Sequence, residues 1–75
     1  MLEIGMLWRD DSTKRTLEEK VLRAAAYYRD KYGRLPTICM VNTAALPAQI
    51  QVEQLTVCPS RTVLPQHFWI GVQQG

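Results

Sequence analysis

The sequence predicts an α+β fold in which one long helix packs on one face of a small mixed sheet, in a two-layer βαβ(β)β arrangement. Three observations lead to this prediction. One segment has apolar residues at helical spacing, the segments around it resemble strands, and some of those strands are apolar on both faces. A chain of 75 residues suffices for one domain, so we expect residues 1–75 to form a single small α/β domain with a flexible tail at 73–75.

The first element that the pattern predicts is a strand over residues 2–9, where side chains alternate between two faces. One face carries apolar side chains throughout, and we expect it to contact the helix. Its members are Leu2, Ile4, Met6 and Trp8, and the opposite face carries Glu3, Gly5, Leu7 and Arg9.

A helix is predicted from about Ser12 to Tyr32. The stretch Asp10–Thr13 offers side-chain oxygens that can accept hydrogen bonds from the first helical N–H groups, so we expect it to cap the helix. Gly33 can adopt the left-handed conformation that ends a helix. The apolar stripe of this helix consists of Leu17, Val21, Ala24, Ala25, Tyr28 and Tyr32.

The segment 37–41 is β-branched and apolar on both faces, which is typical of a strand covered on both sides. Because it follows a strand and a helix, we expect it to lie parallel to the first strand, adjacent to it or one place away. A loop at 42–48 precedes a strand over 50–57, whose alternation slips near Glu53 and indicates a bulge. Residues 58–61 indicate a turn, and a last strand is expected at 67–72.

The predicted sheet has more apolar surface than one helix covers. We expect Leu7, Cys39, Val41 and Trp69 on the face that the helix leaves open, with Tyr27 on the flank of the helix as a peripheral candidate. A twofold dimer, formed face to face or edge to edge, would cover this surface. The alternative is that the chain covers it with its own loop, either 42–51 or 62–66.

Candidate catalytic and metal-binding groups have simpler structural interpretations. Asp10 and Asp11 follow a strand, where carboxylates can hold magnesium, but helix capping already explains them. Cys39, Cys58 and His67 lack the close pairs that zinc sites use. The glycines are scattered, so no phosphate-binding loop is indicated. We therefore expect neither enzymatic activity nor a metal or cofactor.

The basic residues suggest an alternative function. Five of them fall at the ends of predicted elements, where they can contact a phosphate backbone in RNA or DNA. They are Arg9, Lys14, Arg15, Arg34 and Arg61. The net charge of +2 is too small to require this interpretation.

Composition completes the functional expectation. The first residues do not form a signal peptide, no apolar run approaches the length of a membrane span, and the two cysteines are expected to stay reduced. We expect a cytoplasmic, non-enzymatic interaction module that forms a homodimer or docks on a protein partner through its sheet, with nucleic-acid binding as the alternative.

Overall fold

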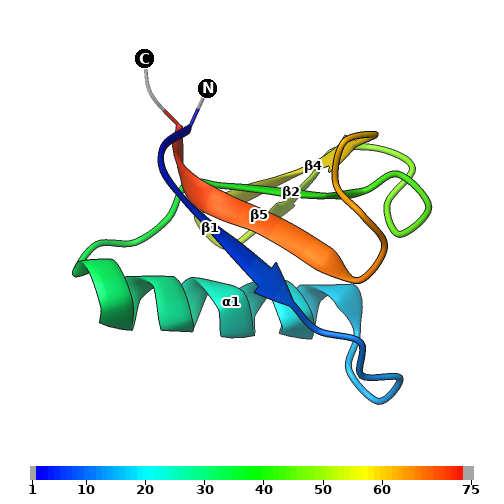
Figure 1. The fold of residues 1–75 in the computed structure, drawn as a ribbon, viewed down its shortest axis with the longest axis horizontal. Coiled ribbons are helices and arrows are strands. Elements are labelled where there is room, and N and C mark those ends of the chain that lie inside the picture. The colour runs from blue at the N-terminus through cyan, green and yellow to red at the C-terminus, as the bar shows by residue number, and fades with distance from the viewer. Residues whose placement is uncertain (1, 74–75) are drawn as a thin grey trace.

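The computed structural model describes residues 2–73 and contains one helix packed on one face of a five-stranded sheet (Figure 1). The predicted α+β class is therefore confirmed. Of the expected tail, Gln73 ends the last strand and residues 74–75 lie outside the described residues. The elements in chain order are β1 (Leu2–Arg9), α1 (Leu17–Tyr32), β2 (Ile38–Asn42), β3 (Ile50–Val52), β4 (Leu55–Ser60) and β5 (His67–Gln73).

The strand order across the sheet is β1-β5-β2-β4-β3. Strand β5 pairs antiparallel with both β1 and β2, so β1 and β2 run parallel with β5 between them. This agrees with the expected strand-helix-strand unit whose strands lie one place apart. Strand β4 pairs parallel with β2, and the short β3 forms the far edge.

Helix α1 begins later than the sequence indicated. Its N-cap is Thr16, whose hydroxyl accepts a hydrogen bond from the Glu19 N–H (3.2 Å), while the Glu19 carboxylate accepts one from the Thr16 N–H (3.0 Å). This reciprocal capping box satisfies two N–H groups. The predicted cap at residues 10–13 was wrong, because Asp10 and Ser12 instead accept hydrogen bonds within the preceding loop. Gly33, with φ of 74°, ends the helix as predicted.

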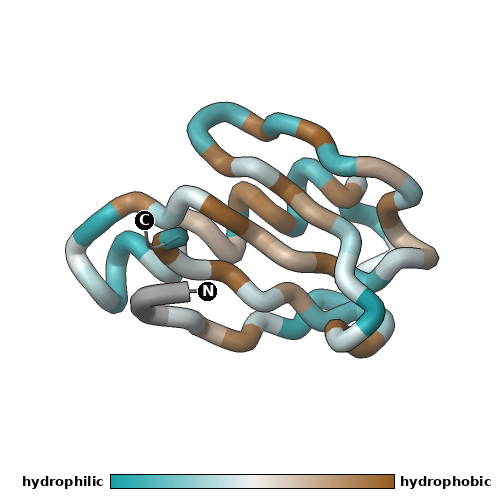
Figure 2. Tube along the Cα trace, turned by 90° about the horizontal axis from the view of Figure 1, so that it is seen from above, coloured by the Kyte–Doolittle hydropathy of each residue, from teal (hydrophilic) through white to brown (hydrophobic). Residues whose placement is uncertain are grey.

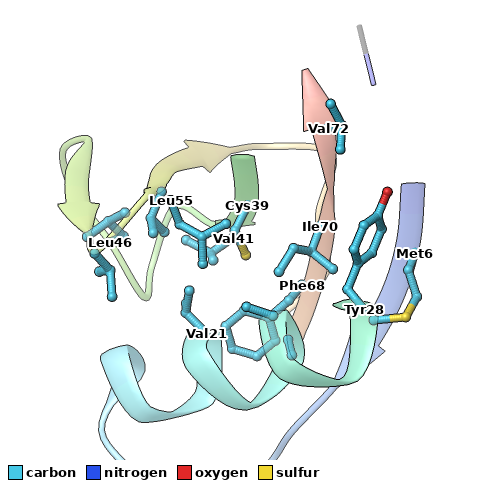
Figure 3. Packing of buried hydrophobic residues seen from close by; sticks show 14 residues of the cluster. Met6, Val21, Tyr28, Cys39, Val41, Leu46, Leu55, Phe68, Ile70 and Val72 are labelled. Atoms are coloured by element: carbon cyan, nitrogen blue, oxygen red, sulfur yellow. The ribbon is translucent and has the colours of Figure 1, made fainter. Parts of the chain in front are cut away.

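The core lies between α1 and the sheet. Val21 of the helix extends toward Cys39 and Val41, and the ring of Tyr28 lies near Ile70 and Met6 (Figure 3). Leu46, from the loop between β2 and β3, closes one end of this core and is 6% exposed. Through Leu46 that loop therefore contributes to the core on the helix side of the sheet.

The segment expected to be one bulged strand is a hairpin. Val52 pairs with Leu55, so Glu53 and Gln54 form a two-residue turn in which Glu53 has a positive φ of 53°. Residues 58–60, expected in a turn, continue β4 instead. A hairpin and a bulge both change the phase of alternation, so the sequence pattern alone did not separate them.

Candidate interaction surface

The sheet face opposite α1 carries an apolar row. In the register of the sheet, Trp69 of β5 stands beside Leu7 of β1 on one side and Met40 of β2 on the other. Figure 2 looks onto this face, with the helix beneath the sheet. Leu7 is 60% exposed and Trp69 and Met40 are half-buried, so the helix leaves a substantial apolar area in contact with water.

A groove of about 390 Å³ lies on this open face. It is bounded by the apolar row and by the loop between β4 and β5, which stands on the same side of the sheet. Its lining residues are Leu7, Met40, Thr62, Val63, Leu64, His67 and Trp69. Leu64 is 66% exposed, so the loop forms one wall of the groove and leaves its mouth open.

The groove-wall loop, residues 61–66, is held by defined contacts. Asn42 at the end of β2 donates a side-chain hydrogen bond to the Val63 carbonyl (2.8 Å), and the His67 N–H donates to the Leu64 carbonyl (3.1 Å). Val63 is 8% exposed and anchors the loop, whereas Leu64 beside it extends to solvent. The sequence analysis offered residues 62–66 as a possible cover for the open face. This loop lines the groove without closing it, so it covers only part of that face.

Trp69 is positioned by a glycine on the neighbouring strand. A Cβ added to Gly5 would lie 2.4 Å from Cζ2 of Trp69, so the indole occupies the space where another residue has a side chain. Such packing over a strand glycine fixes the ring against the sheet surface. The indole therefore forms a flat floor for the groove.

The predicted placement of Cys39 and Val41 on the open face was wrong. Cys39 pairs with Ile70 and Val41 with Phe68. Both belong to the core cluster between the helix and the sheet, where they are 0% and 1% exposed. Met40, between them, occupies the open face instead. Strand β2 is apolar on both faces, so the sequence did not indicate which of its two sets of alternating side chains faces the helix.

The two cysteines lie on opposite faces and both are free. Burial, with a smaller contribution from Cys58, raises the pKa of the Cys39 thiol to about 12. Cys58 pairs with Met40 on the open face and its thiol donates to Oε1 of Gln49 (3.5 Å). A thiol with such a raised pKa is not a nucleophile near neutral pH, because the thiolate is the reactive form.

Tyr27 lies away from the groove. Its ring packs against Trp8 of β1, with centroids 5.0 Å apart, on the helix side of the sheet edge that β1 forms. Tyr27 is 51% exposed, and Nε1 of Trp8 is buried without a hydrogen-bond partner among the described residues. The structure thus places Leu7 and Trp69 on one surface and Tyr27 on another.

The five basic candidates do not form one surface. Arg9 pairs with Asp11 and Arg15 with Asp10, each at 3.3 Å, so carboxylates accompany two of the cations. Lys14 lies in the same loop as Arg15, before the first turn of α1, and Arg61 follows β4. Arg34 follows the last turn of the helix, about 24 Å away at 1.5 Å per residue.

Asp10 and Asp11 have structural partners. Asp10 is 8% exposed, and its carboxylate accepts hydrogen bonds from the Ser12 N–H (3.0 Å) and from the Arg15 guanidinium. It thereby orders the turn between β1 and α1. Within residues 2–73 no three His, Cys, Asp or Glu side chains are grouped as metal ligands.

The groove residues that sequence reasoning missed are Met40 and the loop residues 62–64. Met40 could have been found only by knowing which side chains of β2 face away from the helix. Leu64 precedes a proline in a segment whose apolar residues show no periodicity. Neither position carries a sequence signal of its own. Their grouping depends on strand pairing between segments far apart in the chain.

Comparison of the chain with models of known protein families, with curated proteins and with solved structures finds no match. The one helix of the described chain is too short and too polar to cross a membrane.

Proposed function

We propose that this protein is a non-enzymatic interaction module of the cytoplasm, and that the groove on its open sheet face binds an apolar segment of a partner protein. The observation that carries the proposal is the groove itself, which combines an indole floor with two largely exposed leucines, Leu7 and Leu64. Solvent-exposed apolar grooves of this kind are characteristic of protein interaction sites.

The openness of the groove favours a protein segment over a small molecule. Small-molecule sites bury most of the ligand surface within a concave cavity. Here Leu7 is 60% exposed and Leu64 is 66% exposed, so the rim is formed by the side chains that a partner would cover. Aromatic side chains near the centre of such a patch, here Trp69, supply much of the binding energy.

The rim gives the partner a charge preference. His67 lines the groove, Arg9 pairs with His67 in the sheet register, and Arg61 immediately precedes the lining residue Thr62. An arginine such as Arg61 beside one end of an apolar groove favours a partner segment in which apolar anchors are followed by Asp or Glu. Salt should weaken this electrostatic contribution and leave the apolar contacts largely intact.

Nucleic-acid binding has less support. Two of the five proposed cations are ion-paired with their own neighbours, and Arg34 lies at the far end of the molecule. Binding through phosphate contacts would fall steeply with salt concentration for every sequence tested. That behaviour would distinguish it from groove binding.

A matched pair of leucine variants tests the groove. We would select binders from a random peptide library on the wild-type protein and measure their affinity for Leu64→Asp and for Leu35→Asp. Leu64 lines the groove and Leu35, 51% exposed, does not, so both changes alter a largely exposed leucine. We expect Leu64→Asp to weaken binding by about tenfold or more and Leu35→Asp to have little effect.

An equal loss of peptide affinity in both leucine variants, or an unchanged affinity in Leu64→Asp, would contradict the proposal. Trp69→Arg provides a second measurement, because it places a charge on the groove floor. It should abolish peptide binding, and unchanged binding would show that the interface lies elsewhere. Because Trp69 packs against Gly5, the folding of the Trp69→Arg variant must be checked by circular dichroism.

A further inference from the structure

We propose that the exposed edge of β1 pairs with β1 of a second copy of this chain, which joins two five-stranded sheets into one continuous sheet. The sheet has two edges, β1 and β3. Strand β3 has only three residues, whereas β1 has eight. An unpaired edge strand of that length is a template for adding another strand. This inference does not depend on what occupies the groove.

The register of the sheet identifies which backbone groups of β1 are free. The Asp10 N–H donates to the Gln66 carbonyl (3.0 Å), which continues the antiparallel register of β1 with β5. Hydrogen-bonded pairs alternate along antiparallel strands, so Trp8 and Met6 direct their N–H and C=O groups to β5. The backbone groups of Gly5, Leu7 and Arg9 therefore point outward.

An antiparallel pairing centred on Leu7 uses all of these outward groups. Leu7 then exchanges hydrogen bonds with Leu7 of the second copy, and Gly5 exchanges them with Arg9 in both directions. Strand β1 also shifts register between Leu2 and Gly5, and such irregularities bend an edge away from partners. The segment 5–9 is therefore the part suited to pairing, and it is about 17 Å long.

The segment lacks the features that usually protect an edge. Between Gly5 and Trp8 there is neither a proline nor a charge. Arg9 is the only charged residue of the segment, and Asp11 accompanies it at 3.3 Å. In the pairing centred on Leu7 the two arginines lie at opposite ends, about 14 Å apart along the strands and beyond the Debye length at physiological salt. Two copies therefore meet without like-charge repulsion.

Apolar side chains flank the same edge on both faces. Leu7 is 60% exposed on the open face, and Tyr27, packed on Trp8, is 51% exposed on the helix face. Pairing would remove both from water together with the edge backbone. A stable interface buries about 800 Å² per partner, roughly a sixth of the 4920 Å² surface of this chain. An edge of this length falls short of that, so we expect a dimer that dissociates on dilution.

The twofold geometry also explains why the partner is a second copy. Pairing of β1 with the three-residue β3 of another molecule would be short and would leave open edges that propagate. Pairing of β1 with β1 closes the assembly and leaves only the two short β3 edges. Both open faces then lie on one side of the continuous sheet, so the dimer presents two grooves together.

Amide hydrogen exchange measured by NMR at low and high protein concentration tests the pairing directly. We expect the amides of Gly5, Leu7 and Arg9 to become protected as concentration rises from about 10 µM to 1 mM, the range of a weak interface. Those of Met6 and Trp8 should be protected at both concentrations. If Gly5, Leu7 and Arg9 exchange at the same rate throughout, the proposal is overturned.

Three variants separate edge pairing from other modes of association, with oligomeric state measured by sedimentation equilibrium. Leu7→Pro removes an outward N–H and no hydrogen bond between β1 and β5. Leu7→Lys keeps that N–H but places two like charges at the twofold axis. Met40→Lys alters the groove two strands from the edge.

We expect both Leu7 variants to raise the dimer dissociation constant at least tenfold and Met40→Lys to leave it unchanged. If Leu7→Pro does not fold, Leu7→Lys alone decides. A dimer that Met40→Lys dissociates would be face to face, because Met40 lies on the open face and away from the edge. That result would overturn the edge assignment, as would a wild-type protein that is monomeric at every concentration.

Discussion

Cys39 and Cys58 show how strongly the position of one residue within a strand pair sets its chemistry. They lie on the paired strands β2 and β4, yet Cys39 is fully buried beneath the helix and Cys58 is partly accessible on the open face. The pKa of the Cys39 thiol is raised to about 12, first by burial and then by Cys58. Two chemically identical side chains on paired strands therefore differ in accessibility.

This difference predicts a pH dependence of stability. The folded-state pKa of Cys39 lies above its unfolded value of 9.0, so its contribution is fully present below about pH 9 and is lost as pH rises toward 12. The free energy of unfolding of Cys39→Val should therefore decline less over this interval than that of the wild type, by up to about 1.4 kcal/mol per pH unit. Urea denaturation at several pH values measures this slope.

Cys58→Ala is the control for that measurement, because it also replaces a cysteine but leaves the buried thiol of Cys39 in place. It should keep most of the wild-type slope, because burial is the larger cause of the raised pKa of Cys39 and Cys58 the smaller one. Iodoacetamide at about pH 8 should modify Cys58 and spare Cys39 until the protein is unfolded. Modification of both cysteines at equal rates in the folded protein would contradict the burial of Cys39.

At the scale of the elements, two capping signals in the sequence compete for the start of α1. Residues 10–13 offer several capping side chains, but Thr16 and Glu19 form the spacing of a capping box, which is also visible in the sequence. Hydrogen bonds from the Thr16 backbone and then from its side chain lower the pKa of Glu19. The carboxylate is thus ionised at neutral pH, where it strengthens the cap, and this contribution is lost as pH falls below 4.5.

Replacement of the cap residue tests this assignment. Thr16→Ala removes the acceptor of the Glu19 N–H and should lower the free energy of unfolding by about 1 kcal/mol, the usual cost of losing an N-cap hydroxyl. Thr13→Ala, an exposed threonine in the stretch that the sequence favoured as the cap, should change it by less than half as much. Chemical denaturation measures both. Equal effects would place the start of the helix at the earlier signal.

The sheet shows where local patterns stop being informative. The helix stripe and the parallel relation of β1 and β2 were predictable, because amphipathic spacing and the strand-helix-strand connection act over short stretches of chain. The order β1-β5-β2-β4-β3 and the phase of β2 depend on pairing between distant segments. Met40 therefore entered the groove unpredicted, while Leu7 and Trp69 were predictable because their own strands alternate more clearly.

At the scale of the whole molecule, the excess of apolar sheet surface is distributed between two places. The groove-wall loop shelters part of the open face, and what remains comprises the groove and the edge of β1. These two surfaces share Leu7, which lines the groove and lies on the edge strand. Edge pairing would therefore reshape the rim of each groove, so partner binding and dimerisation should affect one another through a residue common to both.

The proposed dimer predicts that the stability of the protein depends on its concentration. A chain of 75 residues buries only about 60% of its unfolded surface, so its stability as a monomer should be small. Association of folded copies adds a stabilisation that grows with concentration and reaches about 2.7 kcal/mol at one hundred times the dissociation constant. The urea midpoint of the wild type should thus rise across a hundredfold increase in concentration, while that of Leu7→Lys should stay constant. A constant midpoint in both proteins would mean that folded copies do not associate through β1, and a rise in both would place the association on another surface.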